Sequence, residues 1–93
     1  MVKEHYNHWL PKLLNAEGVT LGSHIFYYDD DVSYRTFTHE MVHVEQYRKY
    51  GVPLFLLIYV VHYVIGRLKG LSHDEAYRNI CFEKEAFEKE VKE

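Results

Sequence analysis

Two histidines lie four residues apart in the pentapeptide His39-Glu40-Met41-Val42-His43. On an α-helix this spacing places both imidazole rings on one face, one turn apart, where they can bind one metal ion. Glu40, next to the first histidine, can then reach a metal-bound water and take its proton, which is the chemistry of hydrolysis. We expect the required helix from about Tyr34 to Tyr50, ended by Gly51, a residue suited to a left-handed position after a helix.

Length and composition indicate one small globular domain over residues 1–93. Hydrophobic residues make up 47% of the chain and charged residues 27%, and the formal net charge of -3 gives no electrostatic reason to expect nucleic acid. Domains of this size often gain stability from a metal or from oligomerisation, which leaves a homodimer open. The single cysteine, Cys81, cannot form an internal disulfide, and no secretory leader is recognisable, so we expect a cytoplasmic setting.

Short segments before the motif predict a small amount of regular structure. Residues 9–16 have helical spacing, with Pro11 tolerable in a first turn, and predict a short helix. Residues 19–21 and 24–28 are rich in β-branched or aromatic side chains and are separated by two turn-forming residues. They predict a hairpin or two adjacent strands.

A third helix is expected after Gly51. Pro53 suits its first turn, and the 12 residues from Leu54 to Ile65 are apolar except for His62. Because crossing a bilayer takes about 20 apolar residues, we expect a helix buried in the protein rather than a transmembrane span. A peripheral contact with a membrane is the alternative.

A final helix supplies a candidate for the third metal ligand. Ser72 and Glu75 form a capping box, which starts a helix running towards Lys89. The apolar stripe of this helix, at steps of three and four, is formed by Ala76, Ile80, Phe87 and Val91. The remaining place on the stripe belongs to Glu83. Because a buried carboxylate needs a cation as its partner, we expect Glu83 to bind the metal.

Glu85 is the alternative third ligand. It differs from Glu83 by about 200° around a helix, so only one of the two carboxylates can face the core. Glu85 shares its side with Glu88 and Lys89, where alternating charges are typical of a solvated face. We therefore favour Glu83.

The motif from His39 to His43, followed on a later helix by Glu83-Lys84-Glu85-Ala86, resembles the gluzincin metallopeptidases. The short chain is most similar to their minimal single-domain form, the minigluzincins. Glu83 and Ala86 match the first and fourth places of the clan's Glu-x-x-Ser/Ala-Asp pattern. The fifth place differs, since Phe87 stands where an aspartate commonly orients a zinc-binding histidine. That partner must come from elsewhere.

The resemblance implies a small α+β fold. Its parts would be a sheet of two or three strands, the helix of the HExxH motif, an apolar helix and a C-terminal helix that carries the glutamate. The segment from His24 to Tyr28 would be the strand at the rim of the cleft. A peptide or unfolded protein substrate would add to it as an extra strand.

The implied activity is zinc-dependent hydrolysis of peptide bonds. His39, His43 and Glu83 would bind Zn²⁺, and Glu40 would take the proton of the bound water and deliver it to the leaving amine. The oxyanion that develops needs a further hydrogen-bond donor. The candidates for this donor are Tyr77 and His62, followed by Tyr59 and Tyr63.

Two other forms of the protein are left open. Minigluzincins are regarded as zymogens blocked by a C-terminal segment, and Glu88, Glu90 or Glu93 could reach the metal if the tail folds back. A solvated, frayed helix end is the alternative for the same residues. The chain could also be a non-catalytic, zinc-stabilised binding module. Glu40 argues against this, because a structural zinc site has no use for a base beside its first ligand.

Overall fold

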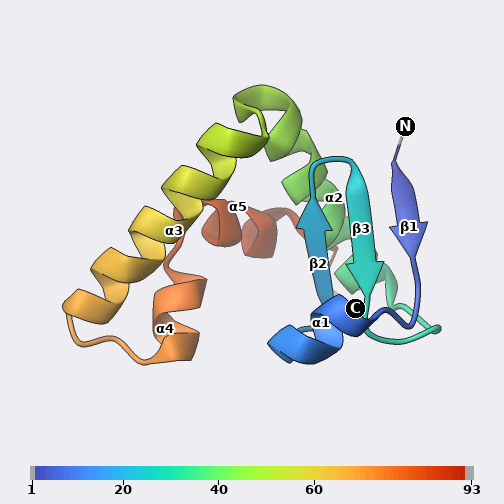
Figure 1. Ribbon diagram of the computed structural model, residues 1–93, viewed down its shortest axis with the longest axis horizontal. Helices are drawn as coiled ribbons and strands as arrows, with labels where there is room; N and C mark the ends of the chain where they lie inside the picture. Colours follow the sequence, from blue (N-terminus) through green and yellow to red (C-terminus); the bar gives the residue numbers. More distant parts are fainter. Residues whose placement is uncertain (1, 92–93) are drawn as a thin grey trace.

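The computed structural model describes residues 2–91, which form a three-stranded sheet and five helices (Figure 1). The elements in chain order are β1 (Lys3–His5), α1 (Trp9–Leu14), β2 (Gly18–Leu21), β3 (His24–Tyr27), α2 (Tyr34–Tyr50), α3 (Val52–Leu68), α4 (His73–Arg78) and α5 (Cys81–Lys89). The fold is α+β, as expected.

The strands form one mixed sheet in the order β1-β3-β2. β2 and β3 make the predicted antiparallel hairpin, with Val19 opposite Phe26. β1 pairs in parallel with the other side of β3 and was not expected, because three polar residues carry no strand pattern. The prediction that residues 24–28 form the rim strand is wrong, since β3 is paired on both sides. The edge strand that contacts α2 is β2.

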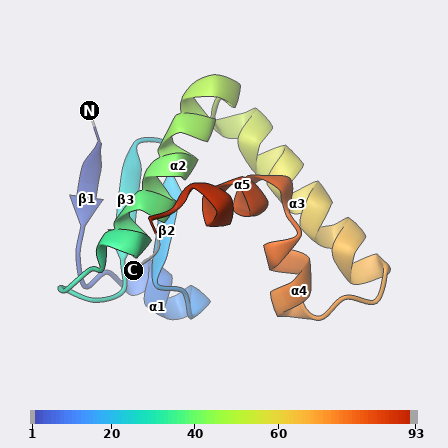
Figure 2. The same cartoon turned by 180° about the vertical axis from the view of Figure 1, so that it is seen from behind.

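α2 has the predicted bounds and lies between the sheet and α5, which crosses its other side (Figure 2). Ser33 caps its first turn by accepting a hydrogen bond from the backbone N–H of Thr36. The chain leaves the helix at Gly51, whose φ of 81° is open to glycine at little cost. Val44 packs with Ile25 and Tyr27 of the sheet, so the face of α2 that carries the motif is fixed against the strands.

α3 is a continuous helix, but the expectation that it would be buried is wrong. Only Phe55 and Gly66 are buried. The large apolar side chains that it exposes are Val52, Leu54, Leu56, Leu57, Val60, Val61, Val64, Ile65 and Leu68. The helix lies at one end of the molecule, where the described elements leave its outer side uncovered (Figure 1). Within residues 2–91 no single helix has the length and apolar character needed to cross a membrane.

The expected final helix is two helices, joined by Asn79 and Ile80. The capping box of Ser72 and Glu75 is present at the start of α4. The chain then turns at Ile80, which has extended backbone angles and is fully buried in a cluster with Tyr47, Phe55 and Phe82. Packing of Ile80 therefore interrupts the helix, and the turn lets α4 lie on α3 while α5 crosses α2.

The closest approach of α3 and α4 can be tested at Gly66. A Cβ atom there would lie 3.1 Å from Cβ and 3.2 Å from Cα of Ala76. We expect Gly66→Val to lower the free energy of unfolding by about 1–3 kcal/mol, because the backbone of α4 has to shift. Arg67→Val, on the exposed side of the same helix, should change it by less than about 0.5 kcal/mol. Equal stabilities of the two variants in urea denaturation would contradict this packing.

Candidate metal centre

Two helices bring three candidate ligands to one point. His39 and His43 lie one turn apart on α2, and Glu83 lies in the first turn of α5. The Oε1 atom of Glu83 is 2.9 Å from Nε2 of His39 and 3.1 Å from Nε2 of His43. Zinc bonds of about 2.0–2.1 Å in a tetrahedral site place ligand atoms about 3.3 Å apart. The donor set and its spacing are therefore compatible with a bound metal ion.

The second ring nitrogen of His43 has its own partner. Its Nδ1 lies 2.8 Å from Oε1 of Gln46. The amide nitrogen of Gln46 donates to the backbone carbonyl of Phe82 at 3.0 Å and to Glu85 at 2.6 Å. Because these bonds fix the amide, its oxygen faces His43, and the Nε2 atom of that ring is left for the metal. Glu85 thus supports the site through Gln46 and is not part of the ligand set.

His39 is held in the same way by Glu90, which the sequence indicated only as a tail carboxylate that could reach the metal. Its Nδ1 lies 2.6 Å from Oε1 of Glu90, which is buried. Val91, expected on the apolar stripe, is exposed instead. A signal was available, because Glu90 follows Glu83 by seven residues, or two helical turns, and so continues the same face.

Glu40 lies beside the ligands and is bound by the edge strand. Its side chain is buried and has an oxygen within 4.8 Å of ligand nitrogens of His39 and His43. The hydroxyl of Thr20 donates to its Oε1 at 2.6 Å, and a Cβ at Gly18 would lie 3.2 Å from its Cγ. β2 therefore fixes the carboxylate next to the metal centre. Burial raises the pKa of Glu40 above its ordinary value.

The four candidate donors for an oxyanion have different surroundings. The hydroxyl of Tyr59 donates to Oε2 of Glu83 at 2.7 Å. Burial raises the pKa of Tyr77, and the charges of Glu83 and Glu40 and a hydrogen bond to Glu83 act in the same direction. His62 is differently engaged, since its Nδ1 accepts a hydrogen bond from the backbone N–H of Cys81 at the start of α5. Tyr63 bonds with His73. Tyr77 and Tyr59 are therefore the hydroxyls that face the ligands.

The buried carboxylate and the two imidazoles shift each other's titration. Burial favours the neutral form of His43, but hydrogen bonding to Glu83 and the charge of Glu83 outweigh it and raise the pKa of His43 to about 9. Burial alone would raise the pKa of Glu83, whereas hydrogen bonds to His39 and His43 hold it well below its ordinary value. In the metal-free protein the positive charge of the protonated histidines therefore balances the charge of Glu83, as a metal ion would.

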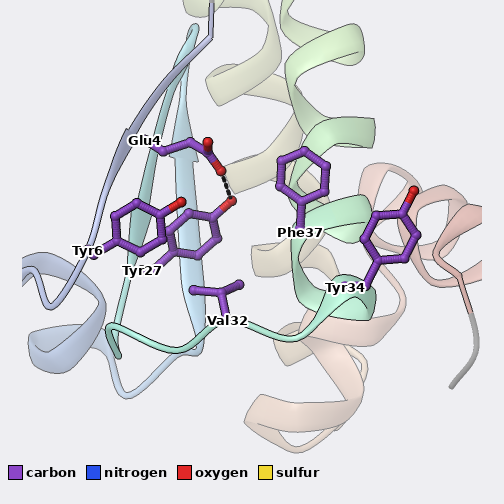
Figure 3. Close-up of a pocket in the computed structure, with 6 residues that line it drawn as sticks. All are labelled: Glu4, Tyr6, Tyr27, Val32, Tyr34 and Phe37. Atoms are coloured by element: carbon purple, nitrogen blue, oxygen red, sulfur yellow. Dashed lines mark hydrogen bonds between the residues drawn. The ribbon is translucent and has the colours of Figure 1, made fainter.

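An open hollow lies elsewhere on the surface. It is formed between the sheet and the start of α2, and its lining residues are Glu4, Tyr6, Tyr27, Val32, Tyr34 and Phe37 (Figure 3). Tyr27 donates to Glu4 at 2.9 Å within it. None of the candidate site residues lines this hollow, so it is separate from the metal centre.

Comparisons with protein-family models, with curated proteins and with solved structures gave no match. The assignment of the site therefore depends on its own geometry and chemistry.

The pairing of His43 with Glu83 predicts a pH-dependent stability of the metal-free protein. The pKa of His43 is about 9 in the folded state against an ordinary value of 6.5, so the stabilisation is complete below pH 6.5 and is lost as the pH rises through 9. A shift of this size corresponds to ~3 kcal/mol in the free energy of unfolding, and His39 adds to it with the same sign. Urea denaturation in the presence of a chelator should show this loss between pH 6.5 and pH 9. His43→Gln should show a smaller one, and identical pH profiles would contradict the pairing.

Proposed function

We propose that this protein is a zinc-dependent metallopeptidase. The observation that carries the proposal is the convergence of two histidine Nε2 atoms on one oxygen of Glu83, with the carboxylate of Glu40 beside them. Two histidines, one glutamate and a free position are the ligand set of catalytic zinc sites, whereas structural zinc sites are usually closed by four protein ligands. The resemblance of the two sequence motifs to gluzincins supports the same function.

The residues of the chain have distinct roles in the proposed reaction. Zinc, when bound, would polarise the peptide carbonyl and lower the pKa of a coordinated water towards 7. Glu40 accepts the proton of this water and returns it to the leaving amine. Thr20 holds Glu40 in place, and the raised pKa of Glu40 suits a group that both takes and gives a proton near neutral pH. Tyr59 anchors Glu83, and the hydroxyl of Tyr77, which also interacts with Glu83, would turn to the oxyanion and stabilise it.

The proposed substrate is a peptide or an unfolded protein bound at the edge of the sheet. An extended chain can pair only with an edge strand, and β2 is the edge strand that contacts the catalytic glutamate. The carbonyl of Thr20 accepts a hydrogen bond from the hydroxyl of Tyr47 at 3.0 Å. A substrate that pairs with β2 would replace the hydrogen bond from Tyr47 with one from its own backbone N–H to the carbonyl of Thr20.

The proposed enzyme is latent in the described conformation. His39, Glu40, His43 and Glu83 are only 4–7% exposed, so a peptide reaches them only after part of the structure moves. The backbone N–H of Val91 donates to Oγ1 of Thr38 at 2.9 Å, which holds the C-terminal segment across the start of α2. Of the carboxylates that could block the metal if the tail folds back, Glu88 is exposed and Glu90 contacts the far side of the His39 ring. Glu93 and the terminal carboxylate lie outside the described residues.

A non-catalytic, zinc-stabilised module is the second candidate. The burial of the ligands favours it, because a closed site serves stability without substrate access. A peptidase requires the carboxylate of Glu40 as a base, whereas a non-catalytic module does not.

The first test of the proposal is the zinc content. We expect one Zn²⁺ per chain after dialysis against a weak chelator, and a loss of most of it in Glu83→Gln, because a neutral amide is a poor zinc ligand. Glu45→Gln, which changes an exposed glutamate of α2 in the same way, should retain the metal. Equal zinc contents in the two variants, measured by elemental analysis, would remove Glu83 from the ligand set.

The second test concerns Glu40. Glu40→Gln should bind zinc and fold like the parent protein, since the amide oxygen can still accept from Thr20, but it should lose more than about 100-fold of the peptidase activity. Activity is measured as cleavage of a denatured protein, with the protein partly opened by mild urea. Cleavage by the variant at the parent rate would show that Glu40 is not the base. A parent protein that binds zinc and cleaves nothing would favour the non-catalytic module.

A further inference from the structure

Glu90 occupies an unusual place for a residue at the end of a helix. It follows the last residue of α5 with extended backbone angles, yet its side chain is 6% exposed. Its Oε1 lies 2.6 Å from Nδ1 of His39, the ring nitrogen opposite the one that faces Glu83. The carboxylate therefore contacts the candidate ligand from behind.

The position that usually supplies such a carboxylate is filled by an aromatic ring. Phe87, one turn after Glu83, packs edge-on against the imidazole of His39 with ring centroids 4.6 Å apart. A hydrocarbon ring at this place orients His39 by contact but cannot accept its Nδ1–H. Glu90, one turn further along the same face, provides the acceptor.

Several contacts fix Glu90 in this place. Its second oxygen lies 3.7 Å from Nε of Arg35, in the first turn of α2. Its backbone N–H donates to the carbonyl of Ala86 at 2.9 Å, and the next N–H, that of Val91, donates to Thr38. Glu90 and Val91, the described residues after α5, are thus bound through their backbone and through the Glu90 side chain. This part of the segment is not a frayed helix end.

We propose that Glu90 is the positioning residue of His39 and that the segment after α5 is part of the metal centre. This inference rests on the proposed zinc site. A carboxylate on Nδ1 selects the tautomer with a free Nε2, fixes the plane of the ring and makes the nitrogen a stronger ligand. Arg35 holds the other oxygen of that carboxylate in its turn. Removal of this segment would therefore release zinc rather than uncover it.

The test compares zinc affinities of the full chain and its variants by competition with a fluorescent chelator. Glu90→Ala removes the acceptor and should raise the Kd for zinc 10–100-fold. Glu90→Gln keeps an acceptor oxygen without the charge and should give an intermediate value. Glu88→Ala and Glu88→Gln are the matched controls, because Glu88 is an exposed glutamate of the same helix, and both should stay within about twofold of the parent.

A second measurement separates positioning from general stability. In the zinc-bound parent protein, nitrogen-15 NMR should show His39 protonated at Nδ1 and bound through Nε2, with a slowly exchanging Nδ1 proton. In Glu90→Ala this proton should exchange faster with water, while circular dichroism shows the same helix content. If Glu90→Ala does not fold, the comparison of Glu90→Gln with Glu88→Gln decides.

The outcomes distinguish the inference from the function on which it rests. A folded Glu90→Ala that binds zinc as tightly as the parent would overturn the role of Glu90 and leave the zinc site intact. A parent protein that binds no zinc would overturn the zinc site and the inference with it.

Discussion

The carboxylate of Glu83 is the group on which the arrangement of the helices depends. It is 4% exposed, and a charge buried to that extent needs strong partners, because the cost of its desolvation is several kcal/mol. Its partners are the two imidazoles of α2 and the hydroxyl of Tyr59 on α3. Each lies within hydrogen-bonding distance only if α5 crosses α2 at one place and α3 lies next to both. The polar centre thus orients three helices that apolar packing alone would let slide.

The remaining groups of the centre are each held by a different part of the chain. Gln46 fixes His43 from within α2, and Glu90 fixes His39 from beyond the end of α5. Thr20 fixes Glu40 from the edge strand. Within the described residues every buried side-chain nitrogen or oxygen has a hydrogen-bond partner. A network satisfied to this degree keeps its geometry, which is what a metal site requires of its ligands.

Sequence patterns predicted those features whose causes are local. The bounds of α2, the hairpin and the capping box at Ser72 follow from neighbouring residues, and so does the burial of Glu83 rather than Glu85. The features that the sequence patterns did not predict depend on contacts between segments that are distant in the sequence. β1 forms only because β3 offers a free edge, and the break at Ile80 follows from packing against α2 and α3. The exposure of α3 depends on how the other elements pack around it, and the residues of the helix itself do not predict that packing. Glu90 was named among the tail carboxylates that could reach the metal, but its contact with the outer ring nitrogen of His39 was not predicted.

The same contacts limit how the proposed enzyme can admit a substrate. Two of the elements that bury the centre also hold its working groups, since β2 carries Thr20 and the segment after α5 carries Glu90. Moving β2 away would release Glu40, and moving the segment after α5 away would free the His39 ring to turn. Either movement would admit a substrate but would also lower the activity of the centre. α3 is different, because it contributes Tyr59 to the centre but holds neither the base nor the outer ring nitrogens of the histidines. Its own anchors are Phe55, stacked on Phe82 with ring centroids 4.4 Å apart, and the close contact of Gly66 with Ala76 of α4. A displacement of α3 would free Oε2 of Glu83 and remove Phe55 from the ring of His43, but it would leave the bonds of Thr20 to Glu40, of Gln46 to His43 and of Glu90 to His39 in place. The opening compatible with the proposed chemistry is therefore on the side of the exposed apolar helix.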